Sequence, residues 1–185
     1  GAIFVRIALL LLSGLLLAAA DVLDYEGPLA TLSPALAIPI GLLVFELSGY
    51  AYHRAAHASP VLFRLHEVHH SSTSMDWLAG FRQHPLEILM TSMVQSLPLV
   101  VLGLPLGAHV LVALLLRLNT SFVHSNVRVP RWLSSFVATP AFHHRHHDRD
   151  AHTANYATLL PVIDRLFGTL ASDDASRFGV ATMPD

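Results

Sequence analysis

Histidine is the residue type around which chemistry in this chain would be organised. Three short segments carry most of the thirteen histidines: "HRAAH", "HEVHH" and "HHRHH" supply His53 and His57, then His66, His69 and His70, then His143, His146 and His147. Residues four apart share a face of a helix, and the second and third segments repeat one one-four-five spacing. Neutral imidazole is a common metal ligand. Because one zinc ion takes only three or four protein ligands, eight histidines favour a site for two metals.

The residues themselves leave the identity of these metals open. The chain has no cysteine, so disulfides, thiolate zinc sites and iron–sulfur clusters are excluded, and any metal must use nitrogen or oxygen ligands. Iron, zinc, copper and nickel all remain compatible with imidazole. Iron with dioxygen can attack an unactivated C–H bond of an acyl or isoprenoid chain, whereas zinc has no redox chemistry.

Two other functions compete with a redox site. His66, Glu67 and His70 resemble the HExxH pattern, which predicts a zinc-dependent membrane hydrolase with Glu67 as general base. A metal-binding or transport protein without enzymatic activity is the second alternative. It would need polar residues along its spans, for which the chain offers Glu46, Glu87, Gln95 and Arg117.

The composition is that of a membrane protein. Of 185 residues 53% are apolar and 13% charged, and the mean hydropathy is +0.52. With a net charge of -2 and no basic tract, we expect no nucleic-acid partner. Length and composition predict one domain over residues 1–185.

Apolar runs predict an all-α fold with about four transmembrane helices. Residues 2–20 are long enough for one span, although a signal peptide is the competing interpretation. A second run covers about 35–52, and a third, 86–118, is interrupted at 102–108 and predicts a helical hairpin. Arg54, Arg64 and Arg82 follow the second run, so all three histidine segments are expected on the cytoplasmic side.

The order of the motifs resembles that of the fatty acid hydroxylase and sterol desaturase superfamily of integral-membrane di-iron oxygenases. The resemblance covers about residues 46–169. It is carried by "HRAAH", "HEVHHSS", "RQHPLE" at 82–87, "FVHSN" at 122–126, "TPAFHHRHH" at 139–147 and "NYATLLPVIDRLFGT" at 155–169.

The resemblance implies four membrane helices with a cytoplasmic helical cap, and a histidine-ligated di-iron centre where the helices meet the cap. Its ligands would be the eight histidines above together with His124. His84 would be a further ligand, or would orient a ligand or cap the helix that Pro85 begins. Glu46, two turns before His53, could hydrogen-bond the outer nitrogen of a ligand or contact another helix. Asn155, Tyr156 and Asp164 are expected to support the site without binding metal.

The expected function is therefore hydroxylation or desaturation of a lipid C–H bond by two iron ions, dioxygen and two external electrons. The lipid could be a sterol, a fatty acyl or sphingoid chain, or a carotenoid, and zinc could replace iron in recombinant protein. The chain has no haem, flavin or nicotinamide fingerprint, so a separate ferredoxin, cytochrome or reductase must supply electrons. Since metal binding needs unprotonated imidazoles, metal should be lost below about pH 6.

Overall fold

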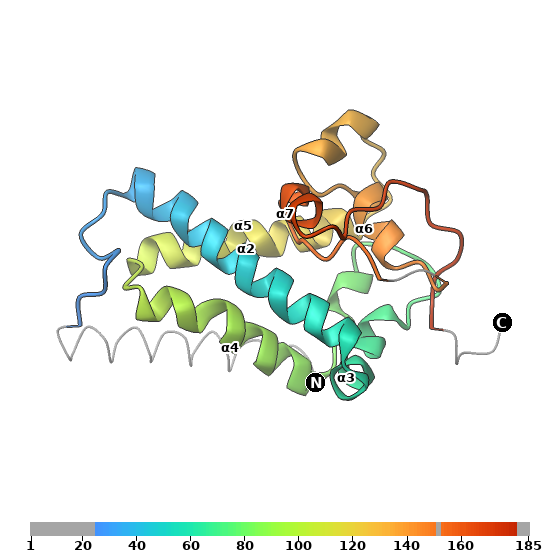
Figure 1. The fold of residues 1–185 in the computed structure, drawn as a ribbon, viewed down its shortest axis with the longest axis horizontal. Coiled ribbons are helices and arrows are strands. Elements are labelled where there is room, and N and C mark those ends of the chain that lie inside the picture. The colour runs from blue at the N-terminus through green and yellow to red at the C-terminus, as the bar shows by residue number, and fades with distance from the viewer. Residues whose placement is uncertain (1–24, 151–152, 181–185) are drawn as a thin grey trace.

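The regular structure is helical throughout the described residues, 25–150 and 153–180, of a computed structural model (Figure 1). The α-helices are α2 (Pro34–Ala58), α3 (Pro60–His70), α4 (Pro85–Val101), α5 (Leu106–Val123), α6 (Pro140–His146) and α7 (Pro161–Leu166). Two short 3-10 helices, η1 (Ala79–Phe81) and η2 (Arg131–Ser135), lie in the connections. The all-α prediction is confirmed for these residues, and the helix predicted over 2–20 lies outside them.

Proline begins five of the six α-helices, and one of these starts shapes the site. Pro60 lacks a backbone N–H and disfavours helical geometry at Ser59, so α2 ends there and α3 starts in a new direction. The Ser59 hydroxyl then accepts a hydrogen bond from the backbone N–H of Leu62. This break turns "HEVHH" back toward "HRAAH".

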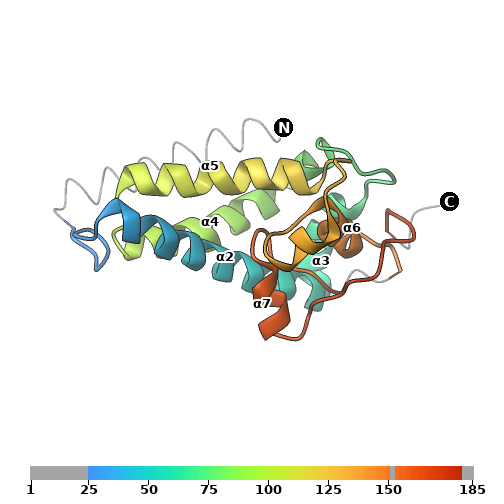
Figure 2. The ribbon, with the colours of Figure 1, turned by 90° about the horizontal axis from the view of Figure 1, so that it is seen from above.

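Three long helices, α2, α4 and α5, run side by side along the longest axis (Figures 1 and 2). The predicted hairpin is present, with α4 and α5 joined by a turn at 102–105. Gly103 has φ +70°, and the Cβ of any other residue there would lie 2.6 Å from the backbone of Gly27. The half of the bundle nearest this turn is filled by an apolar core of Leu29, Ala37, Leu99, Leu104, Ala108, Val112 and Leu116.

The outer surface of these helices is apolar as well. Large side chains such as Leu43, Leu97 and Leu114 are exposed on α2, α4 and α5. In the described chain, α2 and α5 are long and apolar enough to cross a bilayer, while α4 is a shorter apolar helix of 17 residues. Exposed apolar surface of this extent is typical of a protein that contacts lipid. The fold is thus consistent with a membrane protein.

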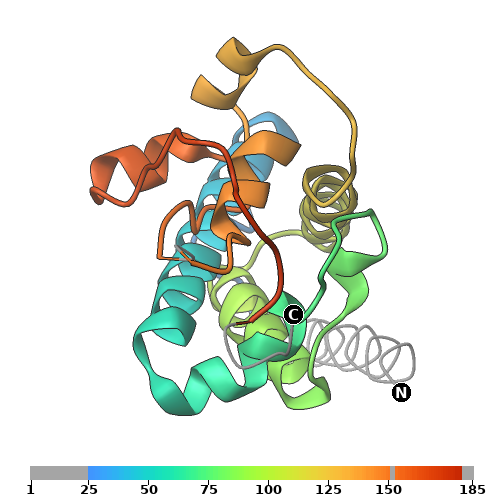
Figure 3. The ribbon, with the colours of Figure 1, turned by 90° about the vertical axis from the view of Figure 1, so that its right-hand side faces the viewer.

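The shorter helices gather as a cap at one end of the bundle (Figures 1 and 3). A second apolar core of Tyr50, Val123, Ala138, Phe142, Tyr156, Ala157 and Ile163 joins this cap to α2 and α5. Asn155 adopts a positive φ of 57°, and its side chain bonds the backbone of Phe142 and Ala171. Asp164 accepts hydrogen bonds from the backbone of Tyr156 and Ala157. Both polar side chains therefore fix the loop that closes over the histidines.

Candidate metal centre

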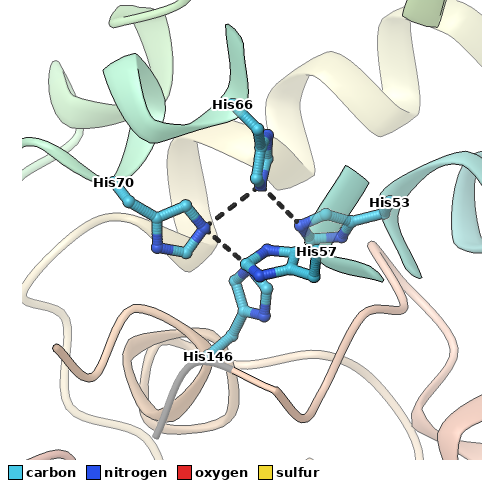
Figure 4. Close-up of side chains that lie close together, drawn as sticks. All are labelled: His53, His57, His66, His70 and His146. Carbon is cyan, nitrogen blue, oxygen red and sulfur yellow. Dashed lines mark hydrogen bonds between the residues drawn. The ribbon is translucent and has the colours of Figure 1, made fainter. Parts of the chain in front are cut away.

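Nine histidines come together at the cap end of the bundle in two adjacent groups. The first, the five-histidine group, contains His53, His57, His66, His70 and His146 (Figure 4). The second, the four-histidine group, contains His69, His124, His143 and His147. Within each group the potential ligand atoms all lie within 4.8 Å of one another. The rings of His70 and His147 stack with centroids 4.3 Å apart, so the two groups are neighbours.

In the five-histidine group the ring nitrogens converge on a common point. Nε2 of His66 lies 3.1 Å from Nε2 of His53 and of His70. The Nε2 atoms of His70 and His146 are also 3.1 Å apart. Two cis ligands on one octahedral ion, at about 2.1 Å from it, would lie about 3.0 Å apart. The spacing therefore fits several imidazoles around one metal ion.

The four-histidine group has the same spacing. Nε2 of His124 lies 3.2 Å from Nε2 of His69 and 3.1 Å from that of His143, which lies 3.1 Å from that of His147. These residues come from α3, the end of α5, and α6 with the residue after it. The group forms only because the α4–α5 hairpin returns the chain to the cap.

The hydrogen bonds of the outer ring nitrogen, Nδ1, determine whether the inner nitrogen, Nε2, which faces the other histidines, carries a lone pair. Nδ1 of His69 donates to the carbonyl of Arg82 at 3.1 Å, and Nδ1 of His124 donates to the carbonyl of Thr120 at 2.7 Å. A carbonyl can only accept, so Nδ1 carries the proton of the neutral ring and Nε2 carries a lone pair. Two such lone pairs 3.2 Å apart repel each other unless a cation lies between them.

The same argument applies in the five-histidine group. Nδ1 of His53 donates to the carbonyl of Tyr156 and Nδ1 of His146 to that of Ala154, both at 2.7 Å. These carbonyls hold the ring orientation and leave Nε2 free to bind metal. Tyr156 also packs its ring against His53, with centroids 5.6 Å apart. Tyr156 thus contacts His53 through both its backbone carbonyl and its ring.

Burial keeps these imidazoles neutral. Desolvation lowers the pKa of His69, His70, His143, His146 and His147 well below the usual value of 6.5, and the neighbouring histidines lower it further. Neutral imidazole is the form that binds a metal. The cap therefore holds the rings in their ligating state at neutral pH.

Two residues were each expected in one of two roles. His84 lies outside both groups and takes the role of helix cap, with its Nδ1 accepting a hydrogen bond from the backbone N–H of Leu86 at 3.2 Å. The hydrogen bonds identified for Glu46 are to backbone and not to a histidine. Its Oε1 accepts hydrogen bonds from the backbone N–H groups of Leu159 and Leu160, because the cap loop crosses α2 at this point.

A carboxylate that the sequence did not single out does contact a histidine. Glu87 lies in the first turn of α4, and its Oε1 accepts a hydrogen bond from Nδ1 of His66. The sequence indicates Glu87 only as one of the polar residues that a transport protein would need along its spans. Its position in the "RQHPLE" motif, three residues after His84, is the sequence feature that could have indicated a role for Glu87 in the site.

Glu67, the base required by a zinc hydrolase, is in neither group. In an HExxH helix the glutamate always follows the first histidine and acts as a base without binding the metal, so its place outside the groups does not decide the matter. The ligand count does: His66 and His70 share their group with His53, His57 and His146, which is more imidazoles than a catalytic zinc site uses.

Comparison with known proteins gives one family and several lipid-modifying relatives. The family model for fatty acid hydroxylase matches residues 38–169. Ornithine lipid hydroxylase OlsE of Rhizobium tropici is 30% identical over 139 residues, covering 73% of this chain and 42% of that protein. Alkylglycerol monooxygenase of Danio rerio is 30% identical, covering 72% of this chain and 30% of that protein. Very-long-chain aldehyde decarbonylase GL1-5 of Oryza sativa subsp. indica is 26% identical, covering 68% of this chain and 22% of that protein.

The chain thus spans less than half the length of these relatives. No solved structure matches the chain.

Proposed function

Because the chain belongs to the fatty acid hydroxylase family, we propose that its nine clustered histidines hold two iron ions and that it oxidises a C–H bond of a lipid. The observation that carries this proposal is the pair of converging sets of ring nitrogens, five and four. In four of these rings, those of His53, His69, His124 and His146, the Nε2 lone pair faces neighbouring imidazoles. We propose the same nine residues as ligands, and His84 as a helix cap.

The ions would supply the activation of dioxygen. Hydroxylation consumes one lipid C–H bond, one O₂, two external electrons and two protons, and gives an alcohol and one water. Desaturation removes two hydrogens from adjacent carbons with the same inputs and gives a double bond and two waters. A separate ferredoxin, cytochrome or reductase supplies the electrons.

The chain's own residues position and protect the centre. The carbonyls of Tyr156, Ala154, Arg82 and Thr120 orient the imidazoles through their outer nitrogens. His70, His124, His146 and His147 are almost completely buried, which excludes bulk water from the reacting atoms. Because the groups lie where the apolar helices end, a lipid could present a chain carbon without leaving the membrane.

A lipid substrate is supported by the relatives, whose names refer to ornithine lipid, alkylglycerol and very-long-chain aldehyde. We propose a lipid with a long aliphatic portion, whether sterol, acyl, sphingoid or carotenoid, and histidine groups on the cytoplasmic side of the membrane. One domain over residues 1–185 would suffice for this centre.

A metal transporter is less well supported. Transport needs a polar path through the spans. In the described part of the bundle, the half away from the cap is closed by the apolar core around Leu99, Leu104 and Val112.

The test is to express the chain with a reductase, supply ¹⁸O₂ and search the lipid extract by mass spectrometry. We expect a lipid carrying one ¹⁸O atom or lacking two hydrogens, and neither product from a His143→Ala, His147→Ala variant. An iron-loaded chain that leaves every lipid unchanged would contradict the proposed reaction.

A further inference from the structure

The two histidine groups differ in the residues that hydrogen-bond the outer nitrogens of their imidazoles. Among the hydrogen bonds identified between described residues, the one from Nδ1 of His66 to Glu87 gives an imidazole a carboxylate partner. The outer nitrogens of His53 and His146 in the same group, and of His69 and His124 in the other, donate to neutral backbone carbonyls. The five-histidine group therefore contains a carboxylate–histidine pair, and the pairings identified in the four-histidine group are neutral.

Glu87 holds its carboxylate against His66 although the side chain is only 1% exposed. Glu87 occupies the first turn of α4, where the unpaired N–H groups and the helix dipole favour a negative charge. Within the part of the chain that the structure describes, its second oxygen, Oε2, has no hydrogen-bond partner. His66 is thus the side chain toward which this buried carboxylate is directed.

We propose that Glu87 is a positioning residue that makes the two metal ions unequal. Two divalent ions among neutral imidazoles bring four positive charges into a buried region. A carboxylate on the outer nitrogen of His66 increases the electron donation of that ring and attracts the nearer ion. The five-histidine group then holds its ion more tightly than the four-histidine group does. This inference depends on the metal centre of the proposed function, but not on the reaction or the lipid.

Glu46 provides a matched control. It is also only 1% exposed and lies on the neighbouring helix α2, but its carboxylate bonds the backbone of Leu159 and Leu160. Replacing either glutamate by glutamine removes one buried carboxyl group and keeps an acceptor oxygen. An effect of charge on the metal should follow Glu87 alone, whereas an effect on folding should follow both.

The experiment measures Zn²⁺ binding to the metal-depleted full chain in detergent, against a chelator of known affinity. We expect two unequal dissociation constants for the wild type. Glu87→Gln should weaken Zn²⁺ binding at the tighter site about 10–100-fold and change the dissociation constant of the other site by less than about threefold. Replacing a residue that hydrogen-bonds a metal ligand typically has an effect of this size. Glu46→Gln should leave both constants unchanged.

A double-mutant cycle assigns the affected site. Glu87→Gln should have its full effect when His147→Ala has weakened the four-histidine group, and a smaller effect when His53→Ala has weakened the five-histidine group. Equal loss at both sites, or no loss, would overturn the proposal. If Glu87→Gln did not fold, the wild type would still decide, because two equal constants contradict the inequality. Zinc binding is measured without dioxygen or lipid, so failure of the oxygenase reaction would not affect this result.

Discussion

At the residue scale, the centre depends on a division of labour between the two nitrogens of each imidazole. The outer nitrogens of His53, His69, His124 and His146 are engaged by backbone carbonyls, so the inner nitrogens present lone pairs to one another. Metal binding removes a repulsion that the fold has already created. Metal binding should therefore stabilise the protein. Protonation of the rings should release the metal and remove that stabilisation.

The first prediction concerns the stability of the metal-free protein as pH falls. Burial lowers the pKa of His69, His143 and His147 in the folded state, whereas the unfolded chain binds protons near pH 6.5. These three histidines contribute fully to the free energy of unfolding above pH 6.5. Their contribution declines as the pH falls from there toward the lowered pKa values of the folded state. We expect the melting temperature to decrease steadily from pH 7.5 to 5.5, and metal content to fall below about pH 6. A melting temperature that rises on acidification, or full metal retention at pH 5, would contradict this.

The spacing of the histidines predicted their grouping, but it could not predict the role of the glutamates. Residues three or four apart share a face of a helix, so the pairing of His53 with His57 and of His66 with His70 could be predicted from the sequence. Glu46 lies on the correct face of α2, but the loop at 159–160 reaches it first. Glu87 is 21 residues from His66, and their contact depends on how two helices pack. Such long-range packing leaves no local periodicity.

At the element scale, the connections position the ligands as much as the helices do. The loop around η1 lies against the four-histidine group, since the carbonyl of Arg82 accepts a hydrogen bond from His69. At Gly80, in the same loop, an added Cβ would lie 3.0 Å from Nδ1 of His124 and 3.3 Å from its Cγ. The absence of a side chain at Gly80 therefore allows the His124 ring its position.

The second prediction follows from this contact. Gly80→Ala should displace the ring of His124 and weaken its bond to the Thr120 carbonyl, which orients it. We expect Zn²⁺ affinity at the weaker site to fall about tenfold, with the tighter site unchanged. Gly107→Ala is the control, because an added Cβ there meets nothing within 4 Å. Equal affinities in the two variants would show that the loop does not position His124.

At the scale of the whole molecule, the site lies where the apolar bundle of α2, α4 and α5 meets the cap of shorter helices. The order of apolar runs predicted α2 and the α4–α5 hairpin, because bilayer spans are defined by length and hydropathy, which are local properties. The packing of the cap could not be predicted in the same way. Short helices such as α6 and α7 are held by contacts between distant segments, for example Tyr50 against Tyr156, at 6.0 Å between centroids.

The third prediction tests the lipid-facing surface. Leu114 lies near the middle of α5 and is 52% exposed, and Val127, in the loop after α5, is 53% exposed. An aspartate at the centre of a span costs about 3 kcal/mol on insertion, whereas on a water-exposed surface it costs little. Leu114→Asp should sharply reduce the protein retained in alkali-washed membranes, and Val127→Asp should not. Equal retention of both variants would argue against a bilayer around α5.

The most direct test of the two-ion centre is the number of metal ions per chain. Protein purified from iron-supplemented cells, or metal-depleted protein reloaded with Fe²⁺ without oxygen, is analysed by mass spectrometry for bound metal. We expect two ions per wild-type chain, and one per chain when His143→Ala and His147→Ala are combined, because the five-histidine group loses no ligand. One ion in the wild type, or none in the double variant, would contradict a centre built from two separate histidine groups.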